Sequence, residues 1–402
     1  MPPLCYRKFT PAPWGICLRG VSFPDTVFLL FMWVCLMPFD VSLIPLAVER
    51  YHRERDRYVK LADRVAEICR TDVCEQNAIR AQVTFRVKSS KSFEGKLRRF
   101  CTRADRNYKS VDEIFAAIGD FSGVRIACYQ FDDCTKIVEH LKTTFKGPEG
   151  DVAVDVKDKH VENRTNFYRA THVQVSLPDE EIIGIYDNVS DISCEIQVCS
   201  MISHVWNEIE HDIGYKPELD GSSEEEQTLL EMLGHTVRAG DAQITLLLKA
   251  HARRATGPQS EAQPDDDARP FRDVHDFVSR MQDFEGGVME NFSDYSGQLY
   301  DLIVDLDLNS PARLIPVLTP FNAGALSHVA TEFGEWLDDI GVPELTPEAD
   351  TSDLMLLQLF DAKLQEIDEL HTQRSGRGRG RPTRLHRMLR RYQDYIEPDD
   401  ED

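Results

Sequence analysis

Between about residues 47 and 217, helix-like and strand-like stretches alternate, and this order constrains the fold more than any other feature of the sequence. The patterns predict helices over 47–77, 92–103, 132–144 and 200–213, and strands over 82–87, 121–130, 171–177 and 191–198. Such alternation is typical of a mixed α/β domain. We therefore expect the fold class α/β (α+β), a mixed β-sheet flanked by helices, followed by a mainly helical C-terminal region.

Changes in composition divide the chain into six regions. The segment 256–270 is polar and contains proline, which indicates a linker. The regions that we expect are an N-terminal extension with a short apolar segment (1–46), the α/β domain (47–220), a helical extension (221–255), the linker (256–270), an acidic helical region of unknown role (271–372) and an Arg-rich, then acidic, disordered tail (373–402).

The negative charge of the chain belongs almost entirely to its second half. The chain has 46 Lys and Arg against 69 Asp and Glu, a formal net charge of -23. The net charge is -2 over residues 1–217 and -21 over residues 218–402. Bulk charge therefore excludes a chain that coats nucleic acid, but the first half can still bind an anionic substrate. A hydrophobic content of 42% excludes wholesale disorder.

The cysteines and one apolar run indicate in which cellular compartment the protein works. No two of the ten cysteines have Cys-x-x-Cys spacing, which disfavours a zinc ribbon and, at this length, a disulfide scaffold. We expect free thiols and a cytoplasmic protein. The apolar run 27–37 is eleven residues long, whereas a spanning helix needs about 20. A membrane anchor through residues 27–48 is the alternative to a packed arm or a non-native extension.

Cations gather where the first predicted strand meets the following helix. Arg86 and Lys88 end the strand, and Lys91 and Lys96 flank Ser92, which we expect to be the N-cap of the helix. Free backbone N–H groups at a helix start, together with nearby cations, are suited to a polyphosphate. A basic helix start is, however, also an ordinary solvated surface.

Two strands carry polar residues on one face. Alternation places Arg125 on the face opposite Val124 and Ile126, and it places Glu195 and Gln197 on the face opposite their apolar neighbours. A carboxylate in such a strand is costly to bury unless it is paired or binds a metal. Asp120 precedes the strand of Arg125, where it can hold Mg²⁺ or simply shape a turn.

The helix after Glu195 allows two interpretations of its faces. We expect Val205, Ile209 and Ile213 to form its buried stripe. His204, Glu208 and His211 share another face, which allows a metal site, although structural polar contacts are the favoured interpretation because no known metal motif has that spacing.

A loop before the third predicted strand combines an aromatic residue with cations. It contains Arg164, Tyr168, Arg169 and His172. Tyr168 can stack on a nucleobase, and such stacking is worth about 1–3 kcal/mol. A tyrosine in this position is also compatible with a place in the core.

In their order, these strings resemble the synthetase domain of RelA/SpoT-type alarmone synthetases (GTP pyrophosphokinases). The resemblance covers about residues 50–220. The motifs that carry it are Arg86-x-Lys88 with a following Ser and Lys, Asp120-x-x-Gly123-x-Arg125, Tyr168-x-x-x-His172, Glu195-Ile196-Gln197, and a later Trp206 and Glu210-His211 helix with Tyr215-Lys216. Each motif is degenerate, but five in the right order make a strong joint signal.

The resemblance implies a nucleotidyltransferase-like synthetase domain and a role for each matching residue. Asp120 and Glu195 match the catalytic acidic residues and Mg²⁺ ligands. The residues that match ATP-binding positions are Arg86, Lys88, Ser92, Lys96 and Arg125, and those that match acceptor-binding positions are Tyr168, His172, Arg164 and Gln197. The implied reaction transfers pyrophosphate from ATP to the 3′-hydroxyl of GDP or GTP, with Mg²⁺ as cofactor, and releases AMP.

Two departures bear on the acceptor. Phe167 stands where the family usually has Gly, and Cys199 stands where it usually has Arg. They are compatible with a toxin-like relative that transfers pyrophosphate to adenosine nucleotides or to the 3′ end of tRNA. A third alternative is a catalytically inactive regulator that binds nucleotides or nucleic acid, but the intact Asp120 and Glu195 argue against it. We also expect synthesis without hydrolysis, because about 46 residues before the domain are too few for the family's hydrolase domain.

The C-terminal tail holds one Arg-rich stretch in an acidic half. Arg374–Arg391 contains eight Arg and no acidic residue, and its Arg379-Gly380-Arg381-Pro382 core resembles an AT-hook. Contact with nucleic acid competes with a disordered tail that pairs with acidic residues. The acidic helical region 271–372 is either a solvated surface or a regulatory or homo-oligomerising element.

Overall fold

The computed structural model describes residues 39–103, 105–163, 165–214, 222–255, 267–282, 284, 289, 291–374 and 383–396. These residues divide into two compact units, one made of residues up to Tyr51 together with Ser90–Ala117, and the other of His52–Ser89 and Ile118 onwards. Helix α2 (Leu43–Ile68) begins in the first unit and continues in the second. The apolar run 27–37 lies outside the described residues.

The first unit is a small helical structure built on aromatic residues. Besides the start of α2, it contains α3 (Ser90–Phe100) and α4 (Val111–Ala116). The ring of Phe93 lies 5.2 Å from that of Tyr51 and 5.9 Å from that of Phe115, centroid to centroid. The N-cap prediction for Ser92 is wrong, because α3 begins two residues earlier and Ser92 lies inside its first turn.

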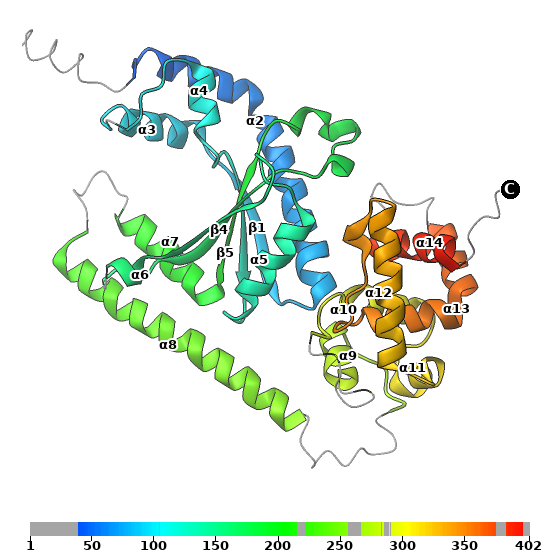
Figure 1. The fold of residues 1–402 in the computed structure, drawn as a ribbon. Coiled ribbons are helices and arrows are strands. Elements are labelled where there is room, and N and C mark those ends of the chain that lie inside the picture. Colours follow the sequence, from blue (N-terminus) through cyan, green and yellow to red (C-terminus); the bar gives the residue numbers. More distant parts are fainter. Residues whose placement is uncertain are drawn as a thin grey trace, which may run out of the picture. The chain divides into compact units, whose positions relative to one another are not determined.

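The second unit contains the predicted mixed sheet (Figure 1). Its strands are β1 (Ala81–Val87), β2 (Ser122–Cys128), β3 (Ala153–Asp158), β4 (Arg169–Val175) and β5 (Cys194–Ser200). They lie in the order β1-β2-β5-β4-β3, in which β2 and β5 are parallel and the other pairs antiparallel. The expected fold class is therefore confirmed, although the sequence patterns did not indicate β3.

One face of the sheet is apolar and covered by helices. Helix α2 is followed by the π-helical turn Cys69–Cys74 and the short 3-10 helix Glu75–Asn77, and α5 (Asp133–Thr144) follows β2. Buried side chains from α2, α5, β2, β4 and β5 form one core, including Leu61, Leu141, Ile126, Val173 and Ile196. Because strand residues alternate between faces, the polar side chains of β2 and β5 are left on the opposite face.

Helix α6 (Lys159–Glu162) follows β3, and α7 (Met201–Gly214) follows β5. Helix α8 (Glu224–Ala255) comes after α7 in the chain. The predicted buried stripe of α7 is wrong: Val205 and Ile209 are 51% and 37% exposed. The buried side chains of α7 are instead Ser203, Trp206 and Asn207. The indole Nε1 of Trp206 donates a hydrogen bond to the Leu230 carbonyl of α8 (3.0 Å), so the contact with α8 sets the rotation of α7.

The C-terminal part of the second unit is helical, as expected. Its helices are α9 (Val274–Met281), α10 (Ser296–Asp305), α11 (Pro311–Leu318), α12 (Ala323–Asp339), α13 (Asp353–Arg374) and α14 (Arg384–Ile396). They enclose a core of their own, which includes Phe277, Phe333, Leu357 and Phe360. Pro316 lies inside α11 and does not break it.

The expectation of a disordered tail is wrong for residues 384–396. They form α14, and Leu385, Met388, Leu389 and Tyr392 of this helix are buried in the C-terminal core. The spacing of these four residues places them on one helix face, and that face is what stabilises the segment. The AT-hook-like residues 379–382 lie outside the described residues.

The free thiols expected from the sequence are present at the cysteines that the structure describes. The described cysteines are all free and buried: Cys69, Cys74, Cys101, Cys128, Cys134, Cys194 and Cys199. Among the described residues, no helix combines the length and the apolar character needed to cross a bilayer.

An ion pair between α13 and α14 provides a test of how the C-terminal helices are held. Arg384 donates two hydrogen bonds to Asp353, at 3.0 and 2.8 Å, and the Asp353 side chain is only 1% exposed. We expect Arg384→Met to lower the free energy of unfolding by about 3–5 kcal/mol, because the carboxylate stays buried without its cation. Urea unfolding followed by circular dichroism measures this change.

The matched control is Arg391→Met in the same helix. Arg391 is 45% exposed and pairs with Asp394 at 3.1 Å on the surface, so its loss should cost less than about 1 kcal/mol. Equal effects of the two substitutions would contradict the role given to the buried pair.

Candidate active site

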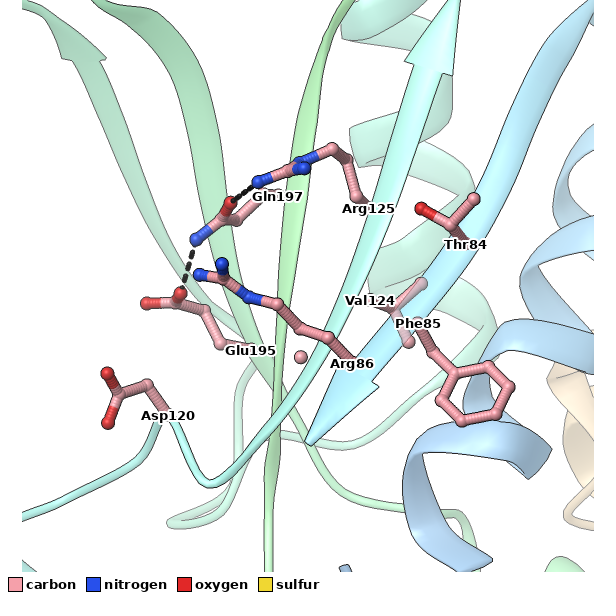
Figure 2. A pocket seen from close by; sticks show the side chains of 9 residues that line it. Thr84, Phe85, Arg86, Asp120, Val124, Arg125, Glu195 and Gln197 are labelled. Carbon is pink, nitrogen blue, oxygen red and sulfur yellow. Dashed lines mark hydrogen bonds between the residues drawn. The ribbon is translucent and has the colours of Figure 1, made fainter. Parts of the chain in front are cut away.

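A pocket opens on the polar face of the sheet where β1, β2 and β5 lie side by side (Figure 2). It encloses about 420 Å³ of empty space, part of it open to solvent. The residues that line it are Thr84, Phe85, Arg86, Asp120, Gly123, Val124, Arg125, Glu195 and Gln197. Two carboxylates and two guanidinium groups therefore share one small cavity.

Strand pairing brings Asp120 to the end of β1. In the antiparallel register, Arg86 lies opposite Gly123, so the last residues of β1 meet the residues just before β2. The backbone N–H of Lys88 donates to the Phe121 carbonyl (3.0 Å), and the Lys88 ammonium lies 2.9 Å from Oδ2 of Asp120. The predicted phosphate-binding cation and the predicted metal-binding carboxylate are thus direct neighbours.

Parallel pairing of β2 and β5 places Glu195 beside them. Gly123 lies opposite Glu195, and Arg125 lies opposite Gln197. Since both strands start at the same edge of the sheet, the carboxylates of Asp120 and Glu195 reach the same pocket. Burial alternates along β5 as the sequence predicted, with Cys194, Ile196 and Val198 buried and the two polar residues partly accessible.

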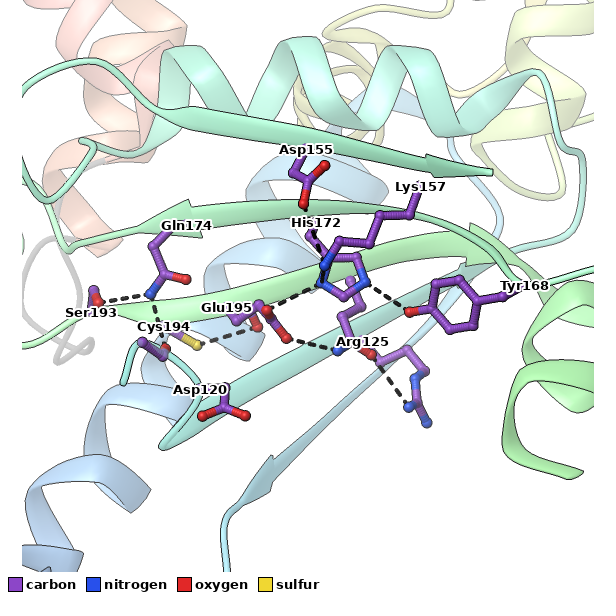
Figure 3. A network of polar contacts seen from close by, with 12 residues as sticks. Asp120, Arg125, Asp155, Lys157, Tyr168, His172, Gln174, Ser193, Cys194 and Glu195 are labelled. Atoms are coloured by element: carbon purple, nitrogen blue, oxygen red, sulfur yellow. Dashed lines mark hydrogen bonds and ion pairs between the residues drawn. The ribbon is translucent and has the colours of Figure 1, made fainter. Parts of the chain in front are cut away.

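Glu195 takes part in a chain of polar contacts that reaches β4 (Figure 3). Gln197 donates from Nε2 to Oε2 of Glu195 (2.7 Å), and Nδ1 of His172 lies 3.1 Å from Oε1. The hydroxyl of Tyr168 lies 2.7 Å from Nε2 of the same imidazole. With a proton on Nδ1, His172 donates to Glu195, and its Nε2 shares one hydrogen bond with the Tyr168 hydroxyl.

This network keeps the Glu195 carboxylate ionised. Burial by itself raises the pKa of Glu195, but the hydrogen bonds from His172 and Gln197 and the charge of His172 outweigh it, so the pKa lies below its ordinary value. Burial raises the pKa of Tyr168, and the nearby charge of Glu195 raises it further. The Tyr168 hydroxyl therefore keeps its proton. The site therefore holds a carboxylate base that is linked through His172 to a protonated phenol.

Arg125 is held by two partners. Its Nη2 lies 2.6 Å from Oε1 of Glu208 on α7 and 3.4 Å from Oε1 of Gln197. Glu208 therefore pairs with a cation, which agrees with the structural interpretation of the His204, Glu208 and His211 face. The ion pair also fixes the orientation of the Arg125 guanidinium group, and Arg125 lines the pocket.

The predicted site residues fall into three groups. In the first group, Arg86, Asp120, Arg125, Glu195 and Gln197 line the pocket, Lys88 and His172 each contact a residue that lines it, and Tyr168 is joined to it through His172. Ser92 and Lys96 belong to α3 of the first unit and do not line this pocket, so their contact with ATP stays a prediction. Arg164 and the Tyr215-Lys216 pair lie outside the described residues.

Sequence reasoning missed Lys157 on β3. Its ammonium lies 3.2 Å from Nδ1 of His172 and 3.4 Å from Asp155. Four of the six residues of β3 are exposed, so the strand shows no alternation of apolar and polar residues that could have revealed it. Pairing with β4 places Lys157 opposite Ala170 at the acceptor end of the network.

The donor set fits Mg²⁺. Among the described residues, no three His, Cys, Asp or Glu side chains gather as a complete metal cage. Mg²⁺ prefers oxygen ligands and usually binds through one or two carboxylates, waters and substrate phosphates. Asp120 and Glu195 supply two carboxylates to one pocket, and these are the residues that would hold the ion.

Both residues that depart from the family pattern are buried. Phe167 is 4% and Cys199 3% exposed. Burial raises the pKa of the Cys199 thiol to about 12, so it is neutral near pH 7 and cannot replace the charge of an arginine.

The lowered pKa of Glu195 leads to a prediction about stability. A carboxyl group with a lower pKa in the folded than in the unfolded chain stabilises the fold above its unfolded value of about 4.3, and this contribution is lost as the pH falls through the folded value. We therefore expect the stability of the native protein, relative to Glu195→Gln, to stay constant between pH 7 and about pH 5 and to decrease as the pH falls below about 4.3 towards pH 3. Urea unfolding of both proteins across this range measures the difference.

The control for this experiment is Glu149→Gln in the exposed turn 147–150. It removes one negative charge without touching the network, and so separates the two effects. A difference between the native protein and Glu195→Gln that stays constant with pH would contradict the role of His172 and Gln197.

Comparison with known proteins agrees with the order of the motifs. A family model described as a region found in RelA / SpoT proteins matches residues 85–220. GTP pyrophosphokinase YwaC of Bacillus subtilis (strain 168) is 31% identical over 132 residues, which are 33% of this chain and 56% of that protein. GTP pyrophosphokinase YjbM of the same organism is 31% identical over 97 residues, 24% and 42% of the two chains. The chain thus spans about half the length of the curated relatives it matches.

Solved structures give more distant matches. The crystal structure of small alarmone synthetase 1 from Bacillus subtilis has 21% identity and a TM-score of 0.41, and the match covers 50% of this chain and 97% of that one. A GTP pyrophosphokinase family protein from Streptococcus pneumoniae has 20% identity and a TM-score of 0.40, with 52% and 98% covered. Residues 85–220 of the chain are therefore a RelA/SpoT region, homologous to the GTP pyrophosphokinases YwaC and YjbM.

Proposed function

We propose that the chain transfers pyrophosphate from ATP to the 3′-hydroxyl of GDP or GTP in a Mg²⁺-dependent reaction that makes the alarmone (p)ppGpp and AMP. The observation that carries this proposal is the meeting of Asp120, Glu195, Arg86 and Arg125 in one pocket of the RelA/SpoT region. The names of the relatives point to the same reaction class.

The charges of the pocket suit the donor. When a diphosphoryl group leaves one oxygen for another, negative charge spreads over its oxygens, and fixed cations stabilise that charge. Arg86 lines the pocket, Lys88 lies beside Asp120, and Arg125 is oriented by Glu208. Mg²⁺ held by Asp120 and Glu195 would neutralise further phosphate charge and orient the leaving group.

Glu195 is suited to receive the proton of the acceptor hydroxyl. Its carboxylate is ionised because His172 and Gln197 donate hydrogen bonds to it, and it still has lone pairs directed at the pocket. A general base of this kind contributes about 10²–10⁴-fold to a rate. His172 links the base to Tyr168, so the base and the acceptor-binding tyrosine belong to one hydrogen-bonded unit.

Tyr168 is the proposed platform for the guanine base. Its hydroxyl is fixed by His172, and the ammonium of Lys159 lies 4.7 Å from the centroid of its ring. The ring is therefore held at its edge and approached by a cation on one face. The opposite face is the one proposed to stack on a base, and a nearby cation strengthens such a stack.

The direct test follows the label of [γ-³²P]ATP. The purified full chain is incubated with Mg²⁺ and, separately, with GDP, GTP, ATP or tRNA. We expect label in the guanosine products. Label only in tRNA or in an adenosine product would contradict a guanosine acceptor, and no transfer to any acceptor would contradict the enzyme itself.

Two isosteric substitutions test the carboxylates. Asp120→Asn and Glu195→Gln should each lower kcat by about 10²–10⁴-fold, because each removes one negative charge that the proposal assigns to Mg²⁺ binding or proton transfer. Asp151→Asn, in the exposed turn beyond the sheet, is the control and should keep the native rate. Retention of full activity by either of the first two variants would overturn its assigned role.

A further inference from the structure

Phe167, the residue before the proposed stacking tyrosine, is enclosed by three helices. Its ring stacks on His160 of α6 with centroids 4.2 Å apart, and it lies edge-on to His235 of α8 (4.7 Å) and Trp206 of α7 (6.1 Å). With 4% of its surface exposed, it points away from solvent. The side chain therefore belongs to the packing behind the acceptor loop.

The contact with α8 depends on a glycine. A Cβ atom placed on Gly234 would lie 2.2 Å from Cγ of Phe167 and 2.3 Å from Cδ2, distances that real side chains do not reach. The absence of a side chain at Gly234 thus lets the ring touch the helix backbone. The glycine lowers the stability of the helix itself, because Gly is about 1 kcal/mol less favourable than Ala inside a helix.

Polar contacts hold α8 against the same region. Arg238, one turn after Gly234, forms an ion pair with Asp158 at the end of β3. The same carboxylate accepts a hydrogen bond from the backbone N–H of His160 (3.2 Å), the second residue of α6. Ser203 of α7 donates to the buried Asp241 of α8 (3.1 Å). Together with the bond from Trp206 to the Leu230 carbonyl, these contacts hold α8 on both sides of Gly234.

The backbone next to Phe167 is equally constrained. The N–H of Tyr168 donates to Oδ1 of Asn166 (3.0 Å), and its carbonyl accepts from the N–H of Lys159 (3.0 Å). Asn207 of α7 bonds the backbone N–H and carbonyl of Arg169 through its amide, at 3.4 and 3.2 Å. A displacement of the Phe167 ring would thus be transmitted to Tyr168 and to its hydrogen bond with His172.

We propose that Phe167 is a positioning residue through which helix α8 sets the place of Tyr168 and hence the affinity for the acceptor nucleotide. The contact between Phe167 and Gly234 joins α8 to the acceptor loop, so a change at Gly234 acts directly on the acceptor side of the site, whereas α8 reaches the ATP side indirectly, through Glu208 of α7 and Arg125. This inference rests on the proposed function, since it assumes a purine nucleotide acceptor at Tyr168.

A double-mutant cycle tests the contact. Gly234→Ala alone should raise KM for GDP about tenfold and leave KM for ATP unchanged, because the new Cβ displaces the Phe167 ring. Phe167→Ala alone should also raise KM for GDP. In the double variant, Gly234→Ala should cause no further increase, since the added methyl group enters the space that the ring has left.

Gly240 provides the matched control on the same helix. A Cβ at Gly240 would meet only Cδ1 of Ile202, at 2.9 Å, the far end of a flexible side chain that can move away. Gly240→Ala should therefore keep the native KM for GDP. A general loss of packing predicts a different result, namely equal losses in kcat with both KM values unchanged, or additive effects of Phe167→Ala and Gly234→Ala. Either result would overturn the proposal.

A measurement without turnover separates this inference from the proposed function. Hydrogen exchange of the backbone amides of residues 165–168 should be faster in Gly234→Ala than in the native chain, while exchange in β1 and β2 stays the same. If the native chain transfers no pyrophosphate but the loop responds in this way, the proposed function fails and the positioning contact stands. If the native chain is active and neither KM for GDP nor exchange changes, the positioning contact is wrong.

Discussion

The parallel pairing of β2 and β5 is the constraint on which the rest of the site depends. It places Gly123 opposite Glu195 and Arg125 opposite Gln197, and it starts both strands at the same edge of the sheet. Because side chains alternate along a strand, the same register that sends Ile126 and Ile196 into the core sends Arg125 and Glu195 to the polar face. A slip of one residue would bury the charged groups and expose the apolar ones. The core and the site therefore select the same register.

Asp120, Arg125 and Glu195 each have a partner of the opposite sign or a directed hydrogen bond, which stabilises their charges. Lys88 faces Asp120, Glu208 faces Arg125, and Gln197 and His172 face Glu195. A half-buried carboxylate without such partners would take up a proton and lose its use as a base. The net charge of -23 has little bearing on this balance, because most of it lies beyond residue 217.

The sequence predicted those parts of the molecule whose pattern is local. Alternation correctly placed Arg125, Glu195 and Gln197, since strand periodicity alone decides their face. It failed for α7, where the large Trp206 and its bond to α8 decide the rotation, and for the edge strand β3, which has mostly exposed residues and is defined by pairing with β4. Residues 384–396 were predicted as a disordered tail from their Arg-rich composition, and the apolar spacing of Leu385, Met388 and Leu389, which fits a helix, was missed.

Phe167 departs from the family pattern, and its packing in the structure changes the interpretation of that departure. In the sequence, a large aromatic residue in place of glycine suggests a changed acceptor pocket. In the structure, the ring is buried among α6, α7 and α8, and Gly234 leaves the space that the ring fills. A bulky residue and a missing side chain thus compensate across two elements that lie 67 positions apart in the chain. The departure therefore concerns how the acceptor loop is held, and a change of acceptor does not follow from it.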